Sequence, residues 1–190
     1  VIFTKTDEQE VGLPGAEFGL FQDDVQMYTA TSDEHGDVCF VDVATGTYQL
    51  KETKAPEGFV RNTKVVDVEI VDTGAREVVL DPELFVNYKG SATITKVNKD
   101  YEVLEGAEFE LYFEDALLQS GLVTDAAGRI ELTDLAPGTY VLKEVKAPEG
   151  YIIDVDAQET EFTIVDEALE IPRTTEHTVV NTKAAIEFTK

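Results

Sequence analysis

Two glutamates occupy positions where the strand pattern calls for an apolar side chain. In "GTYQLKE" (46–52), Tyr48 and Leu50 mark one face of a strand, and the two-residue period places Glu52 on that same inward face. The stretch "GTYVLKE" (138–144) repeats the pattern and places Glu144 in the same phase. Because a buried carboxylate is costly, its occurrence at both positions indicates a chemical role.

Each half of the chain also carries an inward lysine near its start and an inward asparagine near its end. In the first half, Lys5 shares a face with Val1 and Phe3, and Asn87 shares a face with Phe85. The equivalent sets in the second half are Lys96 with Ala92 and Ile94, and Asn181 with Val179. Each half therefore has one Lys, one Glu and one Asn on apolar strand faces, at closely similar spacings.

These three residue types can form a covalent bond when they are buried together. Desolvation lowers the pKa of a lysine and raises that of a glutamate, which yields a neutral amine nucleophile and a protonated carboxyl. That carboxyl can hydrogen-bond the Asn side-chain carbonyl and shuttle protons to the leaving ammonia. The product would be a Lys–Asn isopeptide bond. The pattern alone fits equally well a buried Lys–Glu salt bridge with Asn as a hydrogen-bond partner.

An internal repeat organises the elements that position these residues. "PGAEFGLF" (14–21) matches "EGAEFELY" (105–112), and "ATGTYQLKETKAPEGF" (44–59) matches "APGTYVLKEVKAPEGY" (136–151). "LFVNYKG" (84–90) likewise matches "TVVNTKA" (178–184). The sequence predicts two copies of one domain, 1–89 and 90–183. The tail 184–190, which contains "AIEFTK", is expected to be the first strand of a following repeat in a longer protein.

Each copy has the pattern of an all-β domain. Short alternating runs rich in Val, Ile, Thr, Phe and Tyr are separated by turn signals such as "DEHGD", "DAAGR" and "APEG". Strands of this length and spacing favour a β-sandwich. The stretch "EDALLQS" (114–120) is the one place where a short helical turn is allowed.

At these motifs the sequence resembles a known family. The "TK" near the start, the two "GTY…APEG" stretches and the closing "VVNTK" resemble the Cna B-type domain, an Ig-like, prealbumin-like β-sandwich of Gram-positive surface adhesins and pilins. Copy 1 departs from the closing motif, with "FVNYKG" in its place. The resemblance implies that the first-strand lysine bonds to the last-strand asparagine with help from the glutamate. It assigns these roles to Lys5, Asn87 and Glu52, and to Lys96, Asn181 and Glu144.

Composition excludes several classes of partner. Acidic residues outnumber basic ones by 39 to 15, and the net charge of −24 disfavours nucleic acid and anionic membranes as partners. No stretch approaches the length of a membrane span, and no signal-peptide pattern opens the chain. The acidic clusters lack the ligand spacing of a calcium loop, so we expect no metal and no cofactor.

Other polar side chains are expected to be passive. Cys39 aligns with an outer-face position of the second copy and has no activating base, so it is predicted to face solvent. His35 lies in the "DEHGD" turn and His177 precedes the last strand, and both are predicted to be solvated. Asn62 and Asn98 lie in turn-like stretches without apolar alternation, so neither is predicted to react.

The sequence therefore predicts a structural stalk segment of an extracellular adhesin or pilin-like protein whose parent is anchored to the cell wall. The visible chemistry consumes its own residues once, which argues against a turnover enzyme. We expect a monomer whose partners are neighbouring repeats and an extracellular protein ligand. The alternative is an adhesive module that binds a surface protein of a host or neighbouring cell. Copies of nearly equal length favour the stalk, because a binding module is expected to carry one aberrant copy.

Overall fold

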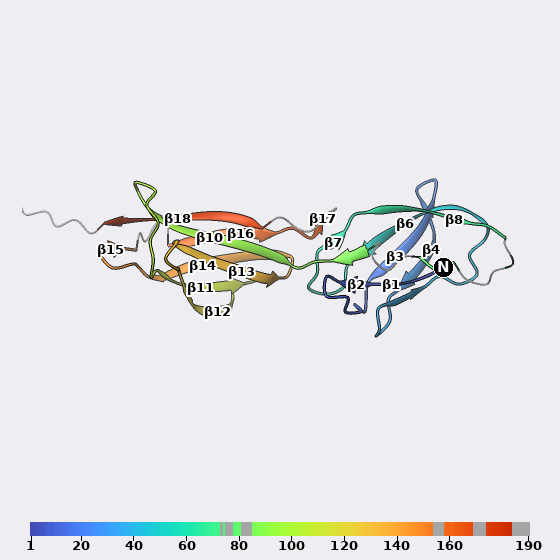
Figure 1. The fold of residues 1–190 in the computed structure, drawn as a ribbon, viewed down its shortest axis with the longest axis horizontal. Coiled ribbons are helices and arrows are strands. Elements are labelled where there is room, and N and C mark those ends of the chain that lie inside the picture. Colours follow the sequence, from blue (N-terminus) through green and yellow to red (C-terminus); the bar gives the residue numbers. More distant parts are fainter. Residues whose placement is uncertain (73, 75–77, 81–84, 154–157, 169–173, 184–190) are drawn as a thin grey trace, which may run out of the picture. The chain divides into compact units, whose positions relative to one another are not determined.

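The computed structural model of the chain describes residues 1–72, 74, 78–80, 85–153, 158–168 and 174–183. The chain divides into two compact units. Unit 1 contains Val1–Lys89 with Val165–Pro172, and unit 2 contains Gly90–Ile164 with Arg173–Lys190. Every regular element in the described residues is a β-strand (Figure 1). The predicted all-β class is confirmed, whereas the tail 184–190 lies outside the described residues.

Unit 1 is built on a four-stranded antiparallel sheet of order β4-β3-β6-β8. Three two-stranded pairings complete the described part of this unit, β1 with β5, β2 with β9 and β7 with β17. The strands are β1 (Ile2–Thr4), β2 (Thr6–Asp7), β3 (Glu17–Gln22), β4 (Val25–Thr31), β5 (Asp37–Cys39), β6 (Gly46–Lys54), β7 (Arg61–Asn62), β8 (Val65–Ile70), β9 (Val86–Asn87) and β17 (Glu167–Ala168).

Unit 2 is a sandwich of two four-stranded sheets, of order β12-β11-β14-β16 and β13-β10-β18-β15. Its first strand, β10, runs parallel to its last strand, β18, over the register Ala92↔Thr175 to Asn98↔Asn181. The strands are β10 (Gly90–Asn98), β11 (Glu108–Phe113), β12 (Ala116–Val123), β13 (Arg129–Leu135), β14 (Gly138–Lys146), β15 (Tyr151–Ile152), β16 (Glu159–Ile164) and β18 (Thr175–Lys183).

The stretch that allowed a helical turn instead forms a β-hairpin. Strand β11 ends at Phe113 and β12 begins at Ala116, so Glu114 and Asp115 form a two-residue loop. Both loop residues have positive φ, 48° and 64°, as a type I′ turn requires. This backbone twist matches the twist of the flanking strands, which is why the hairpin is favoured over the helical turn at this point.

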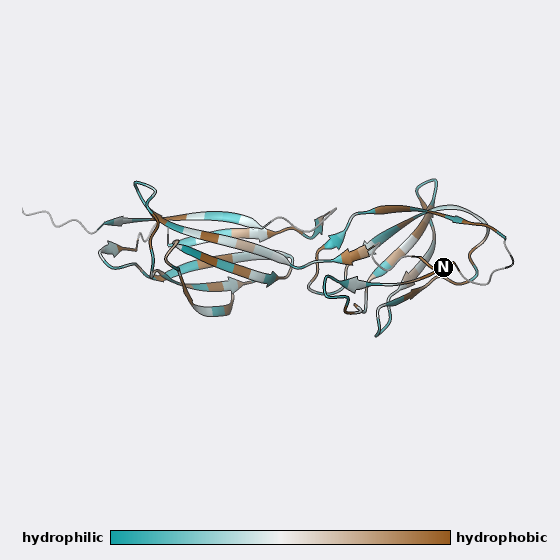
Figure 2. Ribbon diagram, in the orientation of Figure 1, coloured by the Kyte–Doolittle hydropathy of each residue, from teal (hydrophilic) through white to brown (hydrophobic). Residues whose placement is uncertain are grey.

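The two-residue alternation predicted for the strands is confirmed by the burial of their side chains. Hydrophobic and hydrophilic residues alternate along the long strands (Figure 2). In unit 1 the rings of Phe3, Phe18 and Phe85 pack edge to face or tilted, with Phe18 centroids 4.9 Å from Phe3 and 5.1 Å from Phe85. Phe3 and Phe85 precede Lys5 and Asn87 by two residues, and Phe18 is the register partner of Glu52, so this apolar layer adjoins the three polar residues. Among the described residues, no helix is long and apolar enough to cross a membrane.

Candidate functional site

Parallel pairing of the first and last strands brings each lysine next to its asparagine. In unit 1, Asp7 of β2 is the register partner of Asn87, and Lys5 precedes Asp7 by two residues, at the break between β1 and β2. In unit 2, Asn98 is the register partner of Asn181, and Lys96 precedes Asn98 by two. Lysine and asparagine are therefore diagonal neighbours with the same offset in both units. Diagonal neighbours are within reach of long side chains.

The glutamate of each set comes from the other sheet. Glu52 lies on β6 opposite Phe18, and Glu144 lies on β14 opposite Phe109. All six predicted residues are buried, and both lysines have an exposed fraction of 0%. The burial predicted from strand alternation is thus confirmed at every one of these positions.

The backbone of each lysine is held from both sides by hydrogen bonds. Lys5 donates its N–H to the carbonyl of Gly36 at 2.7 Å, and its carbonyl accepts the N–H of Leu13 at 2.8 Å. Gly36 has a φ of 85°, and a Cβ there would lie 2.4 Å from the Lys5 carbonyl oxygen, so only glycine fits. The matching contacts in unit 2 join Lys96 to Gly128 and Leu104. The turns "DEHGD" and "DAAGR" therefore fix where each lysine side chain starts.

In unit 2 the three side chains form a closed triangle. Lys96 Nζ donates to Asn181 Oδ1 at 2.5 Å and lies 3.3 Å from Glu144 Oε2. Asn181 Nδ2 donates to Glu144 Oε1 at 2.6 Å. The amine is thus in contact with the amide group that it would attack, and the carboxyl group touches both the amine and the amide nitrogen.

In unit 1 the same residue types make different contacts. Asn87 Nδ2 donates to Glu52 Oε2 at 3.1 Å and to the carbonyl of Val60 at 2.8 Å. Lys5 Nζ donates to the carbonyl of Thr6 at 2.6 Å. Within the described part of the chain, Glu52 Oε1 and Asn87 Oδ1 are buried without a hydrogen-bond partner. Such orphaned acceptors are rare in folded proteins and mark a site with unused hydrogen-bonding capacity.

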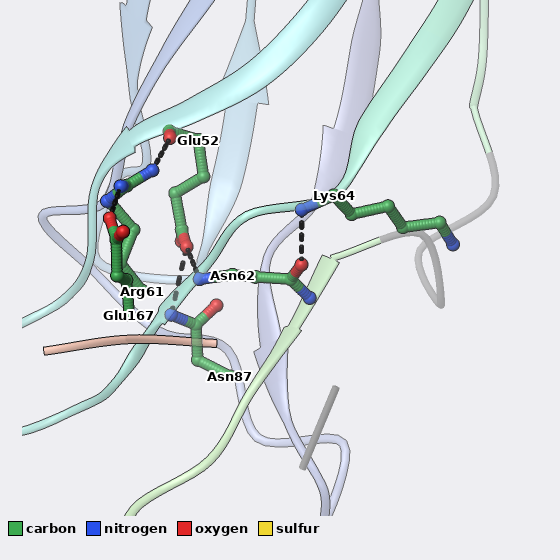
Figure 3. Close-up of polar contacts among 6 residues, drawn as sticks. All are labelled: Glu52, Arg61, Asn62, Lys64, Asn87 and Glu167. Carbon is green, nitrogen blue, oxygen red and sulfur yellow. Dashed lines mark hydrogen bonds and ion pairs between the residues drawn. The ribbon is translucent and has the colours of Figure 1, made fainter. Parts of the chain in front are cut away.

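The backbone of β7 also donates a hydrogen bond to the carboxyl group of the unit 1 site. The Asn62 N–H donates to Glu52 Oε2 at 2.6 Å, so this oxygen is shared by two nitrogens (Figure 3). The sequence did not single out Asn62 for this contact, because every residue except proline has an N–H and the residue type gives no signal. Both Asn62 and Asn98 have their side chains engaged in other hydrogen bonds, and that neither of them reacts stays a prediction.

Burial shifts the pKa values of Lys5, Glu52 and Lys96 in the direction that the chemistry needs. Desolvation lowers the pKa of Lys5 to about 8, although Glu52 and Asp7 oppose the shift by their charge. Desolvation also raises the pKa of Glu52 to about 7, against the hydrogen bonds from Asn62 and Asn87 and the charges of Lys5 and Arg61. Desolvation lowers the pKa of Lys96 as well. A proton can therefore pass between amine and carboxylate near neutral pH at low cost.

The contact between carboxyl and amide differs from the predicted one. The residue pattern predicts a hydrogen bond from the carboxyl group to the side-chain carbonyl oxygen of the asparagine. In both units the carboxyl group instead accepts a hydrogen bond from the amide nitrogen. This nitrogen is the atom that would depart as ammonia, so the arrangement suits proton delivery to the leaving group rather than polarisation of the carbonyl.

The residues expected to be passive divide into two groups. Cys39 and His35 are exposed, as predicted. The prediction for His177 is wrong, because this residue is half-buried on β18, with its ring 5.0 Å from that of Phe162. Burial lowers the pKa of His177. The strand extends further toward its N-terminus than the sequence pattern indicated, and this extension brings the histidine against the core of unit 2.

The chain is similar to several proteins of known structure. The chain is similar to the Bacillus anthracis TIE protein, with 28% identity and a TM-score of 0.55, over 96% of this chain and 33% of that one. It also matches a streptococcal ancillary pilin, with 25% identity and a TM-score of 0.41, over 96% of this chain and 61% of that one. The minor pilin GBS52 of Streptococcus agalactiae matches at 20% identity and a TM-score of 0.47, over 100% of this chain and 98% of that one. No curated protein sequence matches the chain.

This chain spans about a third of the length of the Bacillus anthracis TIE protein. The family model for the SpaA prealbumin-like fold domain matches residues 1–83 and again residues 90–182. These two matches cover nearly the whole chain and coincide with the two sequence repeats. The chain therefore belongs to the family of SpaA prealbumin-like fold domains, of which it contains two in tandem.

Proposed function

We propose that the chain is a stalk segment of a Gram-positive surface adhesin or pilin, in which each domain closes one intramolecular Lys–Asn isopeptide bond. The observation that carries this proposal is the buried triangle of Lys96, Glu144 and Asn181. A salt bridge alone would need only the lysine and the glutamate. Here the amine also contacts the amide, and the carboxyl group contacts the atom that must leave.

The proposed reaction exchanges one C–N bond for another. The neutral Nζ of the lysine attacks Cγ of the asparagine, and the new Nζ–Cγ bond replaces the Cγ–Nδ2 bond. The glutamate takes a proton from the attacking amine and gives one to Nδ2, which departs as ammonia. The reaction needs no oxidant and no cofactor. Burial at contact distance supplies the effective molarity that a free amine and amide lack in water.

The position of the bonds suits a load-bearing role. Tension enters a domain at its first strand and leaves at its last, and these are the two strands that the bond would join. The Lys5–Asn87 bond would shield the 81 residues between them from extension. At about 3.3 to 3.6 Å per residue, this withholds roughly 270 to 290 Å of unravelling. A single chain of such domains, exposed at the cell surface, would be nearly inextensible without any disulfide.

The intact mass of the folded chain tests the proposal. Two isopeptide bonds remove two ammonia molecules from the mass of the sequence, and peptide mapping should find Lys5 joined to Asn87 and Lys96 joined to Asn181. The variant Glu52→Ala should lose the first bond only and fall short by one ammonia. Glu69→Ala, which removes an exposed glutamate of β8, is the matched control and should keep both bonds. A mass equal to that of the plain sequence would refute the proposal.

A further inference from the structure

Strand β7 lies between the unit 1 site and strand β17. β17 follows β16 in the sequence but belongs to unit 1, where it pairs in parallel with β7 in the register Glu167↔Arg61 and Ala168↔Asn62. The N–H of Arg61 donates to the carbonyl of Asp166, and that of Thr63 donates to the carbonyl of Ala168, both at 2.9 Å. Two hydrogen bonds therefore attach this short strand to β17.

The alternation of a strand gives these two bonds a consequence for the site. Successive N–H groups along an extended chain point to opposite sides. Because the N–H groups of Arg61 and Thr63 point to β17, the N–H of Asn62 between them points the other way, to Glu52 Oε2 at 2.6 Å. On that same side, the Val60 N–H donates to the backbone carbonyl of Tyr88. β17 thus fixes the rotation of the backbone that presents the Asn62 N–H to the carboxyl group.

The side chain of Arg61 ties the same two parts together. Its Nη1 donates to the backbone carbonyl of Glu52 at 3.1 Å, and its Nη2 forms an ion pair with Glu167 of β17 (Figure 3). Asn62 continues the connection toward the last strand, because its Nδ2 donates to the carbonyl of Val86, next to Asn87. One path of hydrogen bonds therefore runs from β17 through β7 to the Asn62 N–H, which donates to the carboxyl group. It continues to the backbone next to Asn87, the other donor to that group.

We propose that β17 is a positioning element for the Lys5–Asn87 crosslink. By holding β7 through its backbone pairing and Glu167, it keeps the Asn62 N–H and the Arg61 guanidinium against Glu52 and so sets the orientation of the group that moves the protons. This inference rests on the proposed function, because it concerns the rate of the same reaction. It assigns to residues 166–168, which follow unit 2 strand β16 in the sequence, a role in the chemistry of unit 1.

The charges around Glu52 determine the direction of the expected effect. Lys5 and Arg61 face it as cations, Asp7 acts on Lys5, and Asn62 and Asn87 donate hydrogen bonds to it. The Asn62 hydrogen bond and the Arg61 charge both lower the pKa of Glu52 against the effect of burial. If β17 releases β7, these two contributions weaken and the pKa of Glu52 rises. The pH profile of the first crosslink should then move to higher pH.

The experiment follows both crosslinks in the full chain after folding is started. The chain is synthesised without cells, collected in urea and diluted into buffers between about pH 5 and about pH 9, and each bond is quantified over time by peptide mass mapping. Glu167→Gln removes the ion pair at a side chain that is half exposed. Glu159→Gln removes the same charge from the exposed Lys143–Glu159 pair of unit 2 and is the matched control.

We expect Glu167→Gln to slow the Lys5–Asn87 bond by about twofold to fivefold, the range of a single exposed ion pair, and to shift its pH profile upward. The Lys96–Asn181 bond in the same molecules should form at the wild-type rate, and Glu167→Asp should restore part of the first rate. An unchanged first bond, or equal slowing of both bonds, would overturn the inference while leaving the proposed function intact. Absence of both bonds from the wild-type chain would instead refute the proposed function.

Discussion

The two units carry the same three residue types in the same register, yet only unit 2 has its lysine in contact with its asparagine. Lys96 Nζ reaches Asn181 Oδ1, whereas Lys5 Nζ donates to the carbonyl of its neighbour Thr6. The first strands of the two units also differ. β10 is continuous from Gly90 to Asn98, while the equivalent segment of unit 1 is interrupted at Lys5 between β1 and β2.

The carbonyl that accepts the Lys5 amine belongs to Thr6, the first residue of β2 after this break. In unit 2, where the strand is unbroken, the amine instead contacts the side chains of Asn181 and Glu144. The apolar surroundings also differ, because Phe3 and Phe85 of unit 1 correspond to Ile94 and Val179 of unit 2. A shared motif therefore places the three residues together, and the break at Lys5 accompanies a different set of contacts in unit 1.

The largest expected effect is the loss of stability when the asparagine of either unit is removed. It tests whether the different contacts of the two units still matter once the bonds have formed. Asn181→Ala should remove the second bond and destabilise unit 2, and Asn87→Ala should do the same for unit 1. Because the closed loops contain 84 and 81 residues, the loop-entropy model gives about 4.5 kcal/mol for either bond. Hydrogen exchange resolved by peptide would report the free energy of unfolding of each unit separately.

Gln26→Ala, on an exposed position of β4, is the control for the asparagine variants and should leave both units unchanged. Equal losses in the two units would mean that the different contacts affect only the rate of bond formation. A markedly smaller loss in unit 1 would show that its bond forms in only part of the molecules.

The pH dependence of the first bond gives a second, intermediate effect. Below about pH 7 the Lys5–Glu52 pair holds two protons and the amine is charged, and above about pH 8 it holds none and the carboxylate has no proton to deliver. The rate of Lys5–Asn87 formation should therefore be bell-shaped, with its maximum between these values. Mapping the bond after folding at a series of pH values measures this profile. A rate that keeps rising in alkali would show that only the neutral amine limits the reaction.

The smallest expected effect is a pH dependence of stability that distinguishes unit 2, with its half-buried His177, from unit 1, with its exposed His35. Burial lowers the pKa of His177 in folded unit 2, whereas unfolding restores its ordinary value of about 6.5. The unfolded chain then binds more protons than the folded one, so unit 2 should lose stability as the pH falls below about 6.5. Thermal unfolding of wild type and His177→Gln at several pH values checks this. Unit 1, whose His35 is exposed, should not show the same dependence.

The sequence alone was sufficient to predict the tandem all-β fold and the burial of the six candidate residues. The physical reason is that strand alternation is local: Glu52 follows Tyr48 and Leu50 in phase whatever lies opposite. The repeat supplied a second test of each assignment, because an inward polar residue seen twice is not a chance event. The same local reasoning was wrong at "EDALLQS" and at His177, where the end of a strand was set by its partner strand.

Only the tertiary structure decided which atoms meet. The Lys5 amine turns to the carbonyl of its neighbour Thr6, and the contact of each carboxyl with the amide nitrogen depends on the packing of two sheets. The pairing of β17 with β7 joins residues about a hundred positions apart through backbone groups that are alike in every residue. Such contacts have no signature in residue type or spacing, so the sequence determined which side chains are buried together and the fold determined how they touch.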